Sequence, residues 1–128
     1  MPIAKQLTVT LVNRPGTLAR VARILGDAGV NILAFQASTS GREGNARFIV
    51  NNAKKAKKAL ARAGYSCKEE PVLHVQLPNR VGALGDMAGK LAAKRININW
   101  GYATTVKGQK KATVVFSVSN LNKAARVR

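Results

Sequence analysis

The stretch "LVNRPGTLARVARILGDAGVNI", residues 11–32, decides the fold, because the chain repeats it as "LPNRVGALGDMAGKLAAKRINI", residues 77–98. Both copies place an asparagine, an arginine and a glycine ahead of a helical pattern, and both end on an asparagine and an isoleucine. The offset is constant: Asn13 matches Asn79, and Asn31 matches Asn97. Self-similarity at a fixed spacing predicts that one supersecondary unit occurs twice.

Within the first copy, the hydrophobic period changes from that of a strand to that of a helix. Residues 7–11 alternate aliphatic side chains with threonines, which predicts a strand with one buried face. From Leu18 to Ala28 the apolar residues recur at helical spacing, after a Pro-Gly turn. Gly29 stands where a left-handed helix cap is expected, whereas the second copy has Arg95 there. We therefore expect the second helix of this type to end differently.

The remaining pattern completes a βαββαβ unit. Residues 30–39 and 98–106 predict second strands, and residues 46–51 and 112–119 predict third strands after polar, glycine-containing links. A second helix is expected at about residues 53–63, and a short fourth strand at residues 64–70. The predicted fold class is α+β: a ferredoxin-like βαββαβ sandwich repeated in tandem, with both helices of a unit on one face of an antiparallel sheet.

The two expected domains are residues 1–70 and residues 71–128. The second is truncated at its C-terminus, because "FSVSNLNKAARVR", residues 116–128, leaves room for barely two helical turns and no fourth strand. Its sheet edge is then either bare or covered by another segment or another subunit. An unpaired edge favours association.

The composition argues against an enzyme. One cysteine, one histidine and five acidic residues in 128 leave few side chains for nucleophilic, acid–base or metal chemistry. We therefore expect no catalytic residue, no metal site and no cofactor. A single cysteine fits a reducing compartment, and no apolar run approaches the ~20 residues of a membrane helix. The sequence predicts a cytoplasmic protein with no membrane partner.

The formal charge of +17 leaves a second class of function open. Such a basic surface attracts polyanions, and the fold is also that of RNA-recognition modules. The central third strands, "NARFIVNN" and "KATVVFSVS", carry no paired aromatics for stacking bases. The alternative is therefore a basic nucleic-acid-binding protein with non-specific, backbone-directed contacts. In the other interpretation, lysines such as Lys54 and Lys58 form a solvated helix face.

The run "NRPGTLARVARILGDAGVNI", residues 13–32, resembles the signature of ACT domains, and its repeat at residues 78–98 makes the chain similar to small stand-alone tandem ACT-domain proteins. The resemblance implies a non-enzymatic regulatory protein that binds a free amino acid. The expected site lies where two ACT units pack side by side through their first helices and second strands. It also implies a homo-oligomer, and we expect a homodimer.

The resemblance also implies binding roles for the asparagines of each copy. A free amino acid carries a carboxylate and an ammonium group, which suit the unpaired N–H groups of a helix start and the mixed donor and acceptor of asparagine. In the alternative interpretation, Asn13 stabilises its turn and Asn31 tolerates an unusual backbone. The candidate ligand-binding residues are Asn13, Arg14, Gly16, Thr17, Leu18, Asn31 and Ile32 in the first copy, and Asn79, Arg80, Gly82, Ala83, Leu84, Asn97 and Ile98 in the second.

The first copy is expected to hold the better site. The second copy keeps both asparagines and the glycine, but it has Val81 in place of the turn proline and Arg95 in place of the capping glycine. It also lacks a predicted closing strand.

Overall fold

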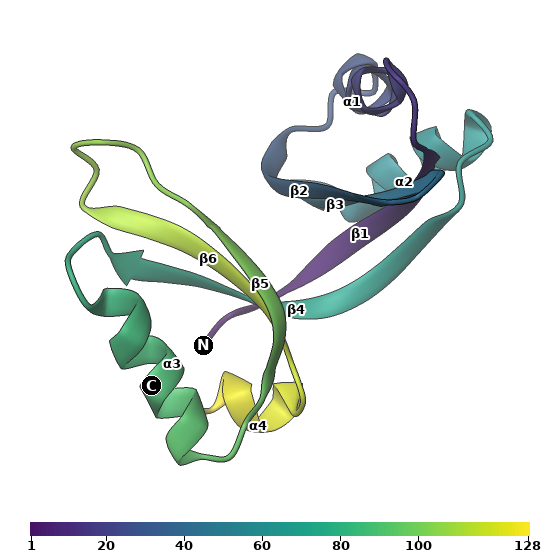
Figure 1. Ribbon diagram of the computed structural model, residues 1–128. Coiled ribbons are helices and arrows are strands. Elements are labelled where there is room, and N and C mark those ends of the chain that lie inside the picture. The colour runs from purple at the N-terminus through teal and green to yellow at the C-terminus, as the bar shows by residue number, and fades with distance from the viewer. The chain divides into compact units, whose positions relative to one another are not determined.

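The structure is a computed structural model that describes residues 1–128 (Figure 1). The contacts within the chain divide it into two compact units. The N-terminal unit is Lys5–Glu70, and the C-terminal unit is Pro71–Arg128 together with Met1–Ala4. The elements in chain order are β1 (Ile3–Val12), α1 (Thr17–Asp27), β2 (Ile32–Ser40), β3 (Glu43–Val50), α2 (Ala53–Arg62), β4 (Cys67–Pro78), α3 (Ala83–Ala93), β5 (Ile98–Thr104), β6 (Lys111–Val118) and α4 (Leu121–Ala125).

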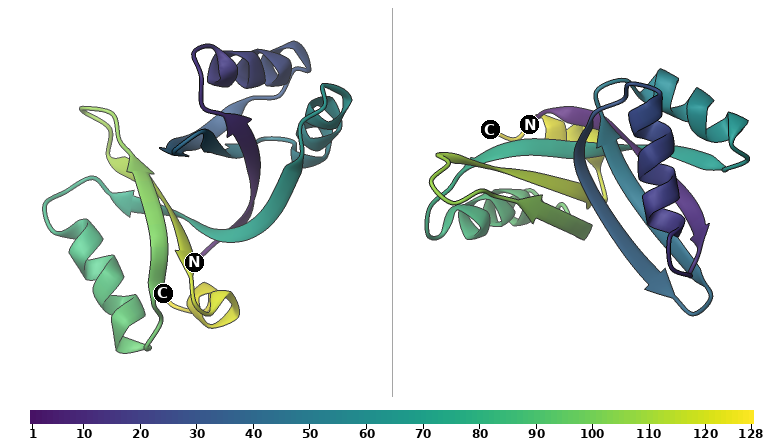
Figure 2. Two further views of the ribbon diagram at one scale, coloured as in Figure 1. Left: turned by 45° about the vertical axis from the view of Figure 1, so that its right-hand side comes forward. Right: turned by 90° about the horizontal axis from the view of Figure 1, so that it is seen from above.

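The N-terminal unit has the predicted βαββαβ order, with strands arranged β2-β3-β1-β4. β3 pairs antiparallel with both β1 and β2. The two helices share one core with the sheet, because Leu25 of α1 and Leu60 of α2 are fully buried against Leu7 and Phe48. Figure 2 shows α1 and α2 side by side, in agreement with their mutual contacts. The alternation of strand residues therefore predicted the buried face correctly.

The C-terminal unit completes its sheet with the first residues of the chain. Its strand order is β1-β4-β6-β5, in which only the start of β1 belongs to this unit. The backbone N–H of His74 donates to the carbonyl of Pro2 at 3.0 Å. The ammonium group of Met1 donates to the carbonyls of Ala125 at 2.7 Å and Val127 at 3.1 Å. Of the three alternatives for this edge, another segment of the same chain is the one found.

β4 is a single strand of 12 residues that passes from one unit to the other without a loop. Its residues Cys67–Glu70 belong to the N-terminal unit, and the strand continues from Pro71 into the C-terminal unit. The predicted fourth strand of the first copy and the predicted first strand of the second are thus one element.

None of the helices is long and apolar enough to cross a membrane.

The expectation that α3 ends differently from α1 is wrong. Arg95 adopts the left-handed backbone with φ 56°, as Gly29 does with φ 75°. The closing hydrogen bonds also match, since Ile96 donates to Leu91 at 3.0 Å and Val30 donates to Leu25 at 2.9 Å. For a residue with a Cβ this conformation costs about 1–2 kcal/mol, so the surrounding fold imposes the turn.

Candidate functional site

The turn before α1 is held by the side chain that both copies share. The Nδ2 of Asn13 donates to the carbonyl of Gly41 at 2.9 Å, and its backbone N–H donates to Arg42 at 2.8 Å. In the C-terminal unit, the Nδ2 of Asn79 donates to Gln109 at 3.0 Å in the same way. Each asparagine therefore ties its turn to the neighbouring hairpin, which supports its structural interpretation. The amide oxygen of Asn13 stays exposed and is available to a ligand.

The helix start that follows has the geometry of an anion site. Gly16 and Gly82 cap α1 and α3 in the left-handed conformation, with φ 91° and 84°, and neither cap makes a side-chain bond. The first-turn N–H groups of a helix attract anions through the helix dipole. Only the first turn of α3 carries an acidic residue, Asp86. The start of α1 is therefore the more favourable of the two for a carboxylate.

Thr17 stiffens the first of these turns and is lost from the second. Its Oγ1 donates to the carbonyl of Val12 at 2.8 Å and to that of Arg14. The equivalent residue, Ala83, is buried and offers no hydroxyl. The N-terminal turn is thus held by the side chains of Asn13 and Thr17. Its repeat is held by Asn79 and by Arg80, whose Nη1 donates to the carbonyl of Val81 at 3.1 Å.

A cavity of about 240 Å³ lies beside the start of α1 in the N-terminal unit. It gathers five of the candidate residues: Asn13, Arg14, Gly16, Thr17 and Leu18. The opposite wall comes from the β2–β3 hairpin, namely Ala37, Ser38, Thr39, Gly44 and Asn45. The polar members of this wall, Ser38, Thr39 and Asn45, were not among the residues predicted from the sequence. The hydroxyl-rich end of β2 was the one sequence feature that could have indicated these residues. Their position at the cavity is set by the hairpin register, which pairs Ser38 with Asn45.

The structure separates Asn31 and Ile32 from the other candidates of the same copy. They follow the end of α1, and an 11-residue helix spans about 16 Å. The backbone N–H of Asn31 donates to the Oδ1 of Asn51 at 3.0 Å, and its exposed side chain makes no hydrogen bond. Asn31 does not have a positive φ, since Arg95 is the one non-glycine residue that does. Asn13 and Asn31 of one unit cannot contact one small ligand together.

The equivalent residues of the C-terminal unit are engaged with one another. The Nη2 of Arg80 pairs with the Oδ2 of Asp86 at 3.0 Å, whereas Arg14 has no acidic partner. The Nδ2 of Asn97 donates to Asn99 at 3.3 Å. Leu84 is exposed on α3, and Ile98 is half-buried against the core. Gly82 and Ala83 lie at the start of α3.

One edge of the N-terminal unit exposes apolar side chains. β2 is the edge strand, and its Leu33 and Phe35 are 48% and 53% exposed. The Phe35 ring stacks on the buried Phe48 at 6.2 Å between centroids, which holds it in place. Leu18 on α1 is also exposed. Apolar residues gathered on an unpaired edge are typical of an interaction surface.

The single cysteine has the character of a structural residue. Cys67 packs against the core of the N-terminal unit. Burial raises the pKa of its thiol above the ordinary value; the nearby Lys57 acts in the opposite direction and Glu69 in the same one. The reactive thiolate is therefore disfavoured at neutral pH.

Two ferredoxin-like units with equivalent asparagine turns define a class of small tandem α+β domain. The chain belongs to a family of that class, the ACT domain pair, whose model matches residues 1–128. The resemblance and the fold class inferred from the sequence are thereby confirmed. The family match supports a regulatory, ligand-binding role, and the matching family is not a catalytic one.

Solved structures share this fold. A protein from Bacteroides thetaiotaomicron is 31% identical with a TM-score of 0.90, and the alignment covers 96% of this chain and 84% of that one. The regulatory subunit of aspartate kinase from Thermus thermophilus, in a ligand-free form, is 17% identical with a TM-score of 0.70, over 98% and 93%. The corresponding subunit from Thermus flavus is 20% identical with a TM-score of 0.58, over 91% and 87%. No protein of curated function matches the sequence.

Proposed function

We propose that the protein is a non-enzymatic regulator that binds a free amino acid between ACT units of two copies of the chain. The observation that carries the proposal is the cavity at the start of α1, where Asn13, Arg14 and Gly16 meet the hydroxyls of the β2–β3 hairpin. The ligand's carboxylate is bound by the first-turn N–H groups and Arg14. Its ammonium group is bound by the Asn13 amide oxygen and by Ser38 and Thr39.

The proposed site is completed by a second copy. Asn31 lies about one helix length from this cavity, so it contributes only when another N-terminal unit packs alongside in the opposite direction. The exposed Leu18, Leu33 and Phe35 at the α1 and β2 edge support this arrangement, because the contact would bury them. The protein is thus proposed to be a homodimer, and its free, unreactive thiol fits a cytoplasmic location.

A thermal-shift and calorimetric screen of the twenty amino acids tests the proposal. A ligand that binds the folded state stabilises it by about 2.7 kcal/mol at a hundredfold excess over Kd. Asn31→Ala is the cleanest variant, because that side chain makes no bond in the free protein. We expect it to leave the unliganded melting temperature unchanged and to weaken the ligand at least tenfold.

Asn13→Ala is a less direct variant, since it also removes the bond to Gly41 and loosens the turn. Light scattering of the wild type and of Leu33→Asp gives the oligomeric state in parallel. If none of the twenty amino acids raises the melting temperature at millimolar concentration, or if Asn31→Ala binds as the wild type does, the proposal fails.

Non-specific nucleic-acid binding is the second candidate, favoured by the helix layer of the N-terminal unit. Its α1 and α2 carry six exposed basic residues without an acidic partner: Arg20, Arg23, Lys54, Lys55, Lys58 and Arg62. Such a surface binds phosphates by counterion release, so its affinity falls steeply with salt. Duplex DNA of random sequence should bind at low salt and dissociate near physiological salt. Replacing Lys54, Lys55 and Lys58 by glutamine should reduce the salt slope; an unchanged slope rules this surface out.

A further inference from the structure

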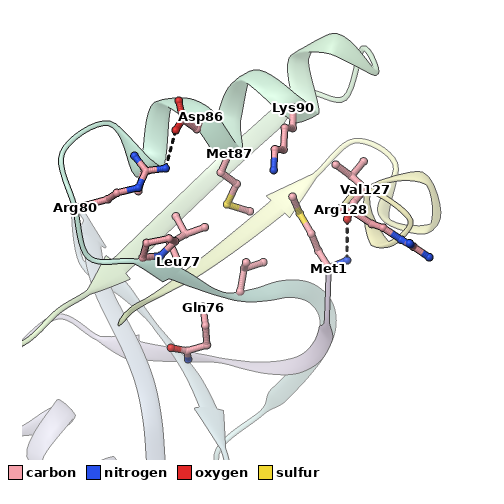
Figure 3. A pocket seen from close by; sticks show the side chains of 12 residues that line it. Met1, Gln76, Leu77, Arg80, Asp86, Met87, Lys90, Val127 and Arg128 are labelled. Atoms are coloured by element: carbon pink, nitrogen blue, oxygen red, sulfur yellow. Dashed lines mark hydrogen bonds and ion pairs between the residues drawn. The ribbon is translucent and has the colours of Figure 1, made fainter. Parts of the chain in front are cut away.

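A separate cavity of about 390 Å³ lies in the C-terminal unit, between α3, β4 and the two ends of the chain (Figure 3). Its volume lies within the ~300–1,000 Å³ typical of small-molecule sites. Much of its wall is apolar and is formed by Val75 and Leu77 of β4, Met87 of α3, and Val127. Met1, Pro78 and Ala83 supply further apolar side chains, and charged residues of α3 stand at the rim.

The cavity extends along α3 as far as Lys90, in a unit whose second helix is short. In the N-terminal unit, α2 has 10 residues and packs on α1, so Ile24 of α1 lies against the shared core. In the C-terminal unit, α4 has only five residues and leaves part of α3 and β4 uncovered. The residue that matches Ile24 in the repeat is Lys90. A cation has thus replaced an aliphatic residue at a position that lines the cavity.

Lys90 is available to pair with a ligand. It makes no hydrogen bond or ion pair in the structure, and the one acidic residue of the cavity, Asp86, is bound to Arg80 at 3.0 Å. Figure 3 shows the ammonium group of Lys90 directed from α3 toward the cavity, on the side of Met87. The site therefore combines an apolar interior with two cations that have no acidic partner, Lys90 of α3 and Arg128.

We infer that this cavity binds a small amphipathic carboxylate, with the aliphatic chain among the methionine and valine side chains and the carboxylate on Lys90. Burial of each methylene group in the apolar wall favours binding, and methionine side chains adapt to the shape of a ligand. The lysine pairs with the carboxylate through charge-assisted hydrogen bonds. A free amino acid is disfavoured, because its ammonium group would face Lys90. The site is therefore distinct from the one proposed at the start of α1.

Methionine methyl NMR reads this cavity directly. The chain contains two methionines, Met1 and Met87, and both line the cavity, so every methionine methyl signal reports on it. The full-length protein is labelled with methyl-¹³C methionine and titrated with 4-methylpentanoate at physiological salt. Leucine and 4-methylpentanol are the matched probes, since one adds an ammonium group and the other lacks the charge. We expect saturable shifts with the carboxylate and at least about tenfold weaker binding of the other two.

Lys90→Ile, which restores the residue found in the other copy, tests the role of the cation. We expect this variant to lose the preference for the carboxylate over the alcohol. Lys94→Ile is the matched control, because Lys94 is an exposed residue at the end of the same helix and does not line the cavity. Unperturbed methyl signals of both unliganded variants confirm that the fold is intact.

The inference is overturned if 4-methylpentanoate leaves the methyl signals unmoved up to about 10 mM. It is also overturned if leucine binds as well as the carboxylate, or if Lys90→Ile keeps the wild-type preference. None of these results bears on the amino-acid site, which is read through Asn31→Ala.

Discussion

The two copies of the repeated unit share the backbone conformation of the turn before the first helix, but they differ in the charged side chains near that turn. In the N-terminal unit, Arg14 and Arg20 line a cavity of about 530 Å³ at the turn, and Arg20 lies 5.5 Å from the centre of the Tyr65 ring. In the C-terminal unit, Arg80 lines the cavity at the equivalent turn. Asp86 stands at the position of Arg20, and it forms an ion pair with Arg80. The two turns share one conformation because it depends on local hydrogen bonds, whereas the charged residues around them differ between the copies.

The largest expected effect concerns the strand that closes each sheet, which comes from Cys67–Glu70 in one unit and from Met1–Ala4 in the other. Deleting residues 1–4 removes the bonds to His74, Ala125 and Val127, each worth about 1 kcal/mol, so we expect a loss of about 3 kcal/mol. Urea unfolding measures it, and hydrogen exchange should show the loss of protection at His74. Pro2→Ala keeps the accepting carbonyl and serves as the control. Equal losses of protection in both units would contradict this division of the chain.

The next largest effect is expected at Gly101 of the edge strand β5, which stands at the position that Phe35 has in the edge strand β2 of the first copy. Gly101 pairs with Phe116, and a Cβ built on it would lie 2.4 Å from the Phe116 ring. Because that ring is buried, Gly101→Ala should cost about 1–3 kcal/mol. Gly85→Ala is the matched control: it meets no atom within 4 Å and should stabilise α3 by about 0.5–1 kcal/mol. Thermal unfolding measures the stability of both variants. If Gly101→Ala and Gly85→Ala change stability equally, the Phe116 ring is free to move.

The helix ends give a smaller effect of opposite sign in the two copies. Arg95→Gly relieves a left-handed residue and should stabilise the protein by about 0.5–1 kcal/mol. Gly29→Ala should destabilise it by about 1 kcal/mol for the same reason. Chemical denaturation measures both. A destabilising Arg95→Gly would show that the arginine side chain contributes more than its backbone strain costs.

The ion pair at the second turn should contribute less than 1 kcal/mol, because both partners are more than half exposed. Asp86→Arg, which reproduces the residue of the first copy, should therefore hardly change stability. It should, however, strengthen the binding of a simple anion such as sulfate at this turn, as measured by calorimetry. If sulfate binding does not change, the divergence in charge has no consequence for ligands.

The smallest effect is expected at the thiol of the closing strand. The raised pKa of Cys67 means that the folded state holds the proton more tightly than the unfolded state. Its contribution to stability is therefore present at neutral pH and is lost as the pH rises through the ordinary thiol range and above it. Iodoacetamide should modify Cys67 more slowly in the folded protein than in urea at pH 8. Equal rates would show that the strand opens readily.

Much of the candidate site was visible in the sequence because it depends on short-range bonds. The turn residues from Asn13 to Leu18 lie together, as expected, since they are neighbours in the chain. Asn13 and Asn31 do not lie together within one unit, because the whole of α1 separates them. Ser38 and Asn45 joined the cavity through the register of the hairpin, and no local pattern encodes that register.

By itself, the sequence determined the repeat, the order of elements, the buried faces and the asparagine turns, because periodicity and turn chemistry act over a few residues. Only the tertiary structure decided that Met1–Ala4 closes the second sheet, through bonds between residues as far apart as Met1 and Val127. It also forced Arg95 into a glycine conformation and exposed Lys90 to a cavity. These features arise from pairing between distant segments, and the packing energy gained there outweighs local preference.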